Sequence, residues 1–254
     1  MDNPYPTMHW SLDGNAESDD RFLSGDLAVS GTGSPWANTG FWTGNGTDDY
    51  LSARWADNEA NFDAVFNIAD GAFLLCARVL FRDGDNLTDA TVFKAGTNFQ
   101  NRGVELYWNG VDKYRCVVGD DNNNTSFKVI TESLGASEDG NLYNLYVWAD
   151  NRDQAKTHLF FDNTAGADPT AGDMGFLGVF GDITGGDDVT NTEDRMISIG
   201  ARSISNGGTI GRFYKGSVQR VWAVNFGQAV PWYMNQFLIN LNNDNLDGDW
   251  WDVA

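Results

Sequence analysis

The acidic residues of this chain are almost all aspartate, and this constrains its fold more than any other feature. Of the 36 acidic residues, 30 are Asp and six are Glu. Asp bonds to its own backbone and favours turns and caps, whereas Glu favours helix interiors. The chain also holds 29 Gly and 26 Asn. The negative charge therefore lies in loops between short apolar runs, which is typical of an all-β protein with long acidic loops.

The composition indicates a folded protein that does not bind phosphate backbones. With 254 residues, of which 41% are hydrophobic and 13% aromatic, the chain can fill a large core. Its formal net charge of −20 opposes binding to nucleic acid and to anionic membrane surfaces. No apolar stretch approaches the length of a membrane span. We therefore predict no nucleic-acid partner and no membrane insertion.

Apolar residues recur with a period of two through most of the chain, which predicts many short strands. In residues 73–81 one alternating set is Phe73, Leu75, Ala77, Val79 and Phe81, and the other is Leu74, Cys76, Arg78 and Leu80. Asn109-Gly110, between two such runs, predicts a hairpin turn. The strands expected here are residues 73–81, 91–95, 104–108, 114–118, 127–131, 142–149, 157–161, 196–200 and 217–225. So many short strands favour two stacked antiparallel sheets over a closed barrel.

Two regions lack this two-residue alternation of apolar residues. Residues 162–194 are rich in Gly and Asp with weak strand signals, which is typical of a functional or partner-bound loop. Residues 231–241 open with Pro231 and carry the only convincing helical pattern. The last residues, 242–254, are polar apart from Trp250 and Trp251. We predict a sandwich domain over residues 1–228, followed by a C-terminal helix and acidic tail over residues 229–254.

Several segments resemble, in the right order, strands of the laminin-G-like and concanavalin-A-like jelly rolls. Residues 40–53 resemble the F-x-G-x-x-x-Y-L strand, and residues 157–163 resemble the L-Y-V-D-G hairpin, with Asn163 where Gly is usual. The other similar segments are residues 9–15, 73–81, 197–201 and 213–222. The resemblance implies an antiparallel two-sheet jelly-roll sandwich with a short C-terminal helix. Such folds serve glycan binding, protein binding, hydrolysis or surface coverage, so the fold does not settle the function.

The hydrolytic branch of that superfamily, similar to laminarinases, needs a Glu-x-Asp-x-Glu run that places nucleophile and acid on one strand face. The sequence holds no such run. Glu105 is the only Glu well inside an expected strand, and we interpret it as an outward-facing polar position. His9 and His158 are too few for a histidine-rich zinc site. We predict no catalytic residues.

Loop carboxylates leave calcium open as a cofactor, because Asp and Asn oxygens suit it. The candidate groups are Asp83, Asp85 and Asp89; Asp120 and Asp121; and Asp182, Asp187 and Asp188. Solvated acidic loops are the alternative, and we assign no metal ligands. Cys76 and Cys116 lie in apolar runs and are expected to be buried free thiols, with a bridge between neighbouring strands as the alternative.

The tryptophans supply the candidate binding residues. Trp36, Trp42 and Trp55 cluster in a loop-rich region and are the predicted sugar-stacking residues, although core packing is the alternative. Trp250 and Trp251 are predicted to dock on a partner, since paired exposed indoles are unfavourable in a free monomer.

These features favour a non-catalytic surface or binding module. The start of the sequence has neither a basic segment nor an apolar one, so it predicts no signal peptide. We therefore expect a virion surface protein, such as a phage capsid decoration protein or fibre component. Its partners would be a capsid or other virion protein, sister copies or cell-surface glycans. The alternative is a carbohydrate-binding lectin-like domain, with calcium as an open option, placed outside the cell or on its surface. A glycan hydrolase or lyase is the least favoured class.

Overall fold

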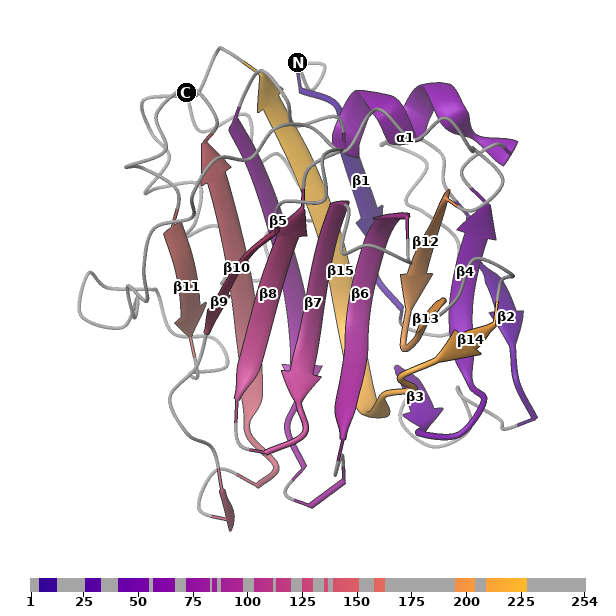
Figure 1. Ribbon diagram of the computed structural model, residues 1–254, viewed down its shortest axis with the longest axis vertical. Coiled ribbons are helices and arrows are strands. Elements are labelled where there is room, and N and C mark those ends of the chain that lie inside the picture. The colour runs from indigo at the N-terminus through magenta and orange to yellow at the C-terminus, as the bar shows by residue number, and fades with distance from the viewer. Residues whose placement is uncertain are drawn as a thin grey trace.

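The computed structural model is mostly strands, arranged as two packed antiparallel sheets (Figure 1). It describes residues 5–12, 26–32, 41–54, 57–66, 72–82, 84–85, 88–97, 103–111, 113–119, 125–129, 135–136, 139–150, 158–162, 195–203 and 209–227. The predicted all-β, two-sheet architecture is confirmed. None of the helices in this part of the chain is long and apolar enough to cross a membrane.

The six-stranded sheet has the order β1-β15-β5-β10-β11, and β3 also pairs with β15. Its strands are β1 (Thr7–Trp10), β3 (Trp42–Asn45), β5 (Ala72–Leu80), β10 (Leu142–Asp150), β11 (His158–Asp162) and β15 (Lys215–Gly227). Strand β1 pairs with one half of β15 and β3 with the other half. The long closing strand therefore holds two N-terminal strands along one edge.

The seven-stranded sheet has the order β2-β4-β12-β6-β7-β8-β9. Its strands are β2 (Ala28–Ser30), β4 (Tyr50–Arg54), β6 (Asp89–Thr97), β7 (Gly103–Asn109), β8 (Tyr114–Gly119), β9 (Thr125–Val129) and β12 (Arg195–Ile199). The short pair β13 (Arg202–Ser203) and β14 (Ile210–Gly211) follows β12. Gly110, with φ of 74°, sits in the turn between β7 and β8 as predicted.

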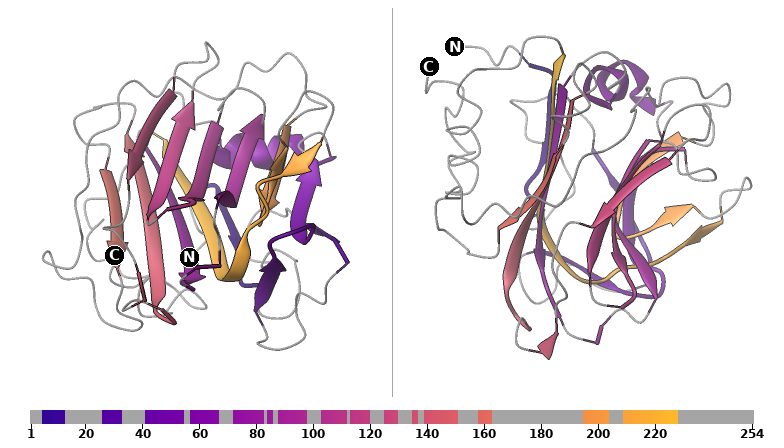
Figure 2. Two further views of the ribbon diagram at one scale, coloured as in Figure 1. Left: turned by 60° about the horizontal axis from the view of Figure 1, so that its bottom comes forward. Right: turned by 60° about the vertical axis from the view of Figure 1, so that its left-hand side comes forward.

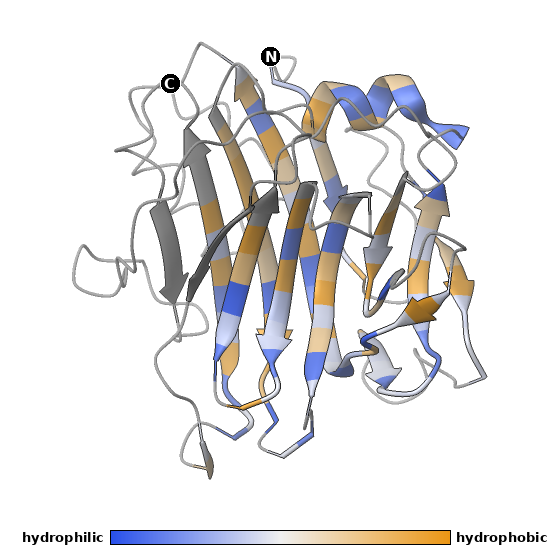
Figure 3. Cartoon of the chain, in the orientation of Figure 1, coloured by the Kyte–Doolittle hydropathy of each residue, from blue (hydrophilic) through white to orange (hydrophobic). Residues whose placement is uncertain are grey.

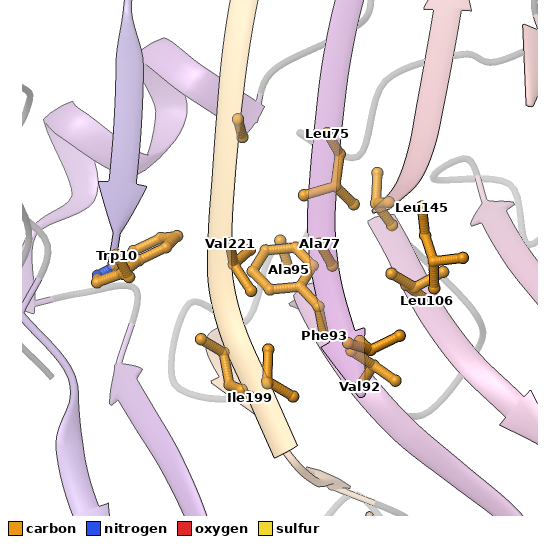
Figure 4. Close-up of a cluster of buried hydrophobic side chains, with 14 of the residues drawn as sticks. Trp10, Leu75, Ala77, Val92, Phe93, Ala95, Leu106, Leu145, Ile199 and Val221 are labelled. Atoms are coloured by element: carbon orange, nitrogen blue, oxygen red, sulfur yellow. The ribbon is translucent and has the colours of Figure 1, made fainter. Parts of the chain in front are cut away.

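The core lies between the two sheets, which Figure 2 shows as two layers. Alternate residues of the central strands, such as β5, β6, β7 and β15, point into it, as the alternating hydropathy along these strands in Figure 3 indicates. Figure 4 shows side chains of both sheets meeting there, among them Leu75, Phe93 and Val221. The Tyr114 and Tyr214 hydroxyls, both buried, lie 2.7 Å apart. In β5 both alternating sets contribute buried residues; Leu74 and Cys76 lie on the second face.

The helix α1 (Glu59–Phe66) closes one end of the sandwich (Figures 1 and 2). It buries Phe62, Val65 and Phe66, which share one face at helical spacing. The Phe66 ring lies 5.8 Å from that of Phe73 and 5.9 Å from that of Phe93, so it joins the two sheets. We did not predict this helix from the sequence. The predicted helix over residues 231–241 and the loop over residues 162–194 lie outside the described residues.

Candidate functional site

A row of polar side chains crosses the outer face of the seven-stranded sheet. The strand registers place Ser52, Ser198, Lys94 and Glu105 side by side, one from each of β4, β12, β6 and β7. The apolar Val117 of β8 follows Glu105 at the end of this row. Their sequence neighbours point into the core: Ile197, Ile199, Phe93, Ala95, Val104 and Leu106. Because strand residues alternate between faces, the polar row must face away from the core.

Glu105 is the centre of a buried hydrogen-bonded network on this face. Its side chain is 1% exposed. The Thr91 hydroxyl donates to Glu105 Oε1 at 2.8 Å, and Arg202 Nη1 donates to Glu105 Oε2 at 2.5 Å. The prediction that Glu105 faces outward was right about the face of the sheet. The side chain is nevertheless buried there and is not exposed to solvent. The carboxylate is buried because Arg202, from the segment after β12, forms an ion pair with it.

Lys94 lies beside Glu105 in the same row and is fully buried. Burial lowers the pKa of Lys94 to about 8, and the attraction of the Glu105 carboxylate opposes that shift. An uncompensated buried ammonium would be costly. Glu105 therefore balances charge for two cations, Lys94 and Arg202, and the cluster keeps a positive excess when Lys94 is protonated.

A tight turn after β12 places Arg202 next to Glu105. Gly200 has φ of 85°, which favours glycine. Its N–H donates to the Val92 carbonyl at 3.0 Å, and the Ser198 hydroxyl donates to the Ala201 carbonyl at 2.6 Å. These bonds hold the backbone next to Arg202 against β6 and β12.

Arg115 and Tyr107 extend the cluster along the same face. They are directly opposite in the β7–β8 register, and a side-chain hydrogen bond joins them. Burial raises the pKa of Tyr107, and the bond to Arg115 works against that rise. The Nε atoms of Arg115 and Arg202 are both buried and have no hydrogen-bond partner. Two guanidinium groups on one face thus each keep an unused donor.

Of the predicted sugar-stacking tryptophans, the structure describes Trp42 alone. Trp42 is completely buried, and its ring packs so closely on Gly200 that a Cβ there would lie 2.0 Å from it. A ring with no exposed surface cannot stack on a sugar, so Trp42 is a core residue. Trp36, Trp55, Trp250 and Trp251 lie outside the described residues, and their roles stay predictions.

The candidate calcium carboxylates within the described residues are engaged in ion pairs. Asp85 contacts Lys215 at 2.8 Å, and Asp89 contacts Arg212 at 3.1 Å. No group of three or more His, Cys, Asp or Glu that could hold a metal occurs in the part of the chain that the structure describes. The other candidates lie outside it: Asp83, Asp120, Asp121, Asp182, Asp187 and Asp188. Cys76 and Cys116 are free and buried, as predicted.

Sequence reasoning missed Lys94, Arg115 and Arg202 as site residues. One signal was present, because Lys94 and Glu105 are charged residues in the middle of apolar strands. No local signal marks Arg202, which reaches Glu105 across 97 positions of sequence.

Comparison with known proteins gives structural neighbours only. No family model matches the sequence, and no curated protein matches it. The binding domain of botulinum neurotoxin DC, solved in complex with SialylT, has a TM-score of 0.55 at 9% identity, over 95% of this chain and 52% of that one. The receptor-binding domain of the mosaic serotype C/D neurotoxin has a TM-score of 0.54 at 13% identity, over 94% and 50%. This chain spans about half the length of these domains.

A sialidase CBM40 domain from Ruminococcus gnavus, bound to α2,3-sialyllactose, has a TM-score of 0.45 at 14% identity, over 73% of this chain and 86% of that one. That score is too low to carry an argument. The toxin domains support the fold alone, because their identities are so low. The two-sheet sandwich is therefore shared with known binding domains, whereas membership of the laminin-G-like family stays a prediction.

Proposed function

We propose that this chain is a non-catalytic glycan-binding module whose ligand binds on the outer face of the seven-stranded sheet. The observation that carries the proposal is the arrangement of Arg115, Arg202 and Tyr107. Each comes from a strand segment. Arg202 is held by Glu105, and Arg115 and Tyr107 hold each other on the same face. Binding sites combine a rigid scaffold with a few convergent polar groups of this kind.

The comparisons agree with this class of function. The neurotoxin DC binding domain that shares the fold was solved with SialylT bound. That ligand belongs to the toxin, and it motivates a test with sugars here. Of our two sequence-based hypotheses, the lectin-like alternative fits this face better than the virion hypothesis does.

The proposal is tested by screening the purified chain on a glycan array and measuring affinity for the strongest hit by calorimetry. We expect binding that falls by about tenfold or more in Arg115→Gln, because a charge-assisted hydrogen bond contributes about 1.5–3 kcal/mol. Arg82→Gln is the matched control, since Arg82 lies elsewhere, is 48% exposed and pairs with Asp139. If no glycan binds, the proposed function is wrong.

The placement on a virion surface is a separate proposal that rests on the sequence. Glycan adhesion by a capsid decoration protein or fibre component would use the same sheet face. Docking by Trp250 and Trp251 would then use residues 242–254, so the two roles are separable by deletion.

A further inference from the structure

We infer that the outer face of the six-stranded sheet is a docking surface within the molecule, and that its occupant is the chain's own C-terminal segment, residues 229–249. The inference combines three observations: the burial of this face, an apolar stripe in the segment, and complementary charge. It is independent of the proposed function, which concerns the other sheet.

The outward side chains of the six-stranded sheet are buried almost as completely as those of the core. Its inward residues, such as Leu75 and Val221, belong to the cluster between the sheets. The residues between them point outward, and the following are exposed by 6% or less: Thr7, His9, Leu74, Cys76, Asn144, Tyr146, Trp222, Val224 and Phe226. One row crosses four neighbouring strands: His9, Trp222, Cys76 and Tyr146. Most of this face is therefore apolar and shielded from water.

No described helix or strand is layered on this face. The described elements outside the two sheets are α1 and the β13–β14 pair. The apolar side chains of α1 belong to the cluster between the sheets, and β13 follows β12 of the other sheet. At the edge, the centre of the Tyr5 ring lies 4.9 Å from that of the Phe226 ring. Figure 2 shows the described strands as two layers. Since the outward side chains are buried in a single chain, a segment of that chain outside the described residues must cover them.

Residues 229–241 have the sequence that such a cover needs. Within the helix expected over residues 231–241, four apolar residues stand at positions i, i+3, i+4 and i+7 and share one face: Met234, Phe237, Leu238 and Leu241. Asn235 and Gln236 fall outside that face. A helix over residues 231–241 would be about 16 Å long. The three strand spacings from β15 to β11 amount to about 14 Å, so the helix is long enough to cross the sheet.

The segment also begins at this face. Strand β15 lies inside the sheet between β1 and β5, and its last outward side chain, Phe226, is buried. The strand ends at Gly227, whose φ is 53° and whose N–H donates to Asn225 Oδ1 at 2.9 Å. The following residues therefore leave the sheet beside its apolar rows.

The other long segment, residues 163–194, is less suited to this role. It follows β11, which lies at the edge of the sheet. Its apolar run, residues 174–180, is interrupted by Gly175 and Gly178. Glycine inside a helix is unfavourable, so this run does not offer a continuous apolar helix face.

The charges of the face and of the segment are complementary. Arg220 of β15 lies opposite Arg78 of β5, next to the apolar row, and both are partly buried. Residues 242–249 contain no Lys or Arg but hold three aspartates: Asp244, Asp247 and Asp249. Opposite charges attract more strongly near a protein surface than in bulk water. The acidic residues after the apolar stripe therefore match the arginines beside the apolar row.

Cross-linking to Cys76 tests the inference in the intact chain. With Cys116→Ala in place, one cysteine at a time is introduced along the stripe, and the protein is oxidised mildly: Met234→Cys, Phe237→Cys, Leu238→Cys and Leu241→Cys. A disulfide requires Cα atoms within about 7 Å, so peptide mapping by mass spectrometry detects close contact. We expect a disulfide to Cys76 within one chain from at least one stripe position. Asn235→Cys and Gln236→Cys are the controls and should give none.

The reactivity of the native thiols gives a second measurement. Phe237→Asp/Leu238→Asp places two charges on the stripe and should release the segment from the sheet. Cys76 should then react with a thiol reagent at least about tenfold faster than in wild type, because the rate follows the population of the open state. Cys116 lies between the sheets and should stay protected. Asn235→Asp/Gln236→Asp adds the same charge outside the stripe and should leave Cys76 protected.

Three results would overturn the inference. A disulfide from Leu177→Cys to Cys76, with none from the stripe, would assign the face to residues 163–194. Disulfides found only between chains would assign it to a second copy. Protection of Cys76 in Phe237→Asp/Leu238→Asp equal to that in wild type would show that the stripe does not cover this face.

Discussion

At the scale of single residues, two charged side chains, Lys94 and Glu105, lie in the middle of strands. Both are buried in the described structure. A buried charge is tolerated only when it is paired and hydrogen-bonded. Here the partners are Thr91 and Arg202, at 2.8 and 2.5 Å from the Glu105 oxygens.

We predict that Glu105→Leu lowers the free energy of unfolding by about 3–5 kcal/mol, the range for breaking a buried ion pair. The loss leaves Lys94 and Arg202 buried without their carboxylate. Urea denaturation of wild type and variant measures it. Asp139→Asn is the control, since Arg82–Asp139 is an exposed pair at 3.6 Å and should cost less than about 1 kcal/mol. Equal costs for the two variants would contradict the structure of the cluster.

Lys94 should also make stability depend on pH. Its pKa is 10.5 without burial and about 8 in the fold, so between these values the unfolded chain binds more protons. The cost of burying the charge is fully present below pH 8 and disappears as pH rises. Relative to Lys94→Met, wild type should gain up to about 1.4 kcal/mol per pH unit in that window. The titratable groups acting on Lys94 are Glu105, Arg202, Cys116 and Arg212. Parallel unfolding free energies for the two proteins across the window would count against this prediction.

At the scale of elements, the turn between β12 and β13 ties the site to the core. Gly200 supports Arg202 on one side and contacts the Trp42 ring on the other. Trp42 belongs to β3 in the six-stranded sheet and Gly200 follows β12 in the seven-stranded sheet. Gly200 therefore takes part both in the packing between the two sheets and in the turn that positions Arg202.

We expect Gly200→Ala to be far more destabilising than Gly84→Ala. Both glycines have positive φ, 85° and 70°, so each variant pays about 1–2 kcal/mol of backbone strain. Only Gly200 has a contact that a Cβ would violate; Gly84 has nothing within 4 Å. Overpacking against Trp42 should add about 1–3 kcal/mol. Thermal unfolding of the two variants measures the difference. Similar melting temperatures would show that the Trp42 ring can move aside at little energetic cost.

At the scale of the whole molecule, the two sheets share one core and should unfold together. Cys76 lies in the six-stranded sheet and Cys116 in the seven-stranded sheet, and both are buried. Burial also raises the pKa of Cys116, which suppresses the reactive thiolate. We predict that neither thiol reacts with a thiol reagent in native buffer. In urea both should become reactive at the midpoint given by tryptophan fluorescence. Separate midpoints would mean that the sheets unfold independently.

The hypothesis of partner docking also belongs to the whole molecule. Deleting residues 242–254 should abolish assembly on a particle if Trp250 and Trp251 are the docking residues, and should leave glycan binding unchanged. Sedimentation of the full and shortened chains with the particle measures the first effect, and calorimetry measures the second. Unchanged assembly would remove these tryptophans from the docking hypothesis.

The sequence by itself determined the sheet architecture. Alternation predicted nine strands close to their observed places, such as β5 and β10, because each apolar face must be buried on another sheet. The free thiols were predictable for the same reason. The helix α1 was missed, although Asn58 before apolar residues at positions 62, 65 and 66 is a usable start signal.

Only the tertiary structure decided the site. Strand register set Lys94 beside Glu105, and a turn from β12 brought in Arg202 from 97 positions away. The tertiary structure also places Trp42 in the core, whereas the sequence predicted it on a binding surface. The alternation of apolar and polar residues predicts which face of the sheet a side chain lies on. Pairing between strands far apart in sequence decides which residues it contacts on that face. That pairing depends on the packing of all strands together, which no local pattern encodes.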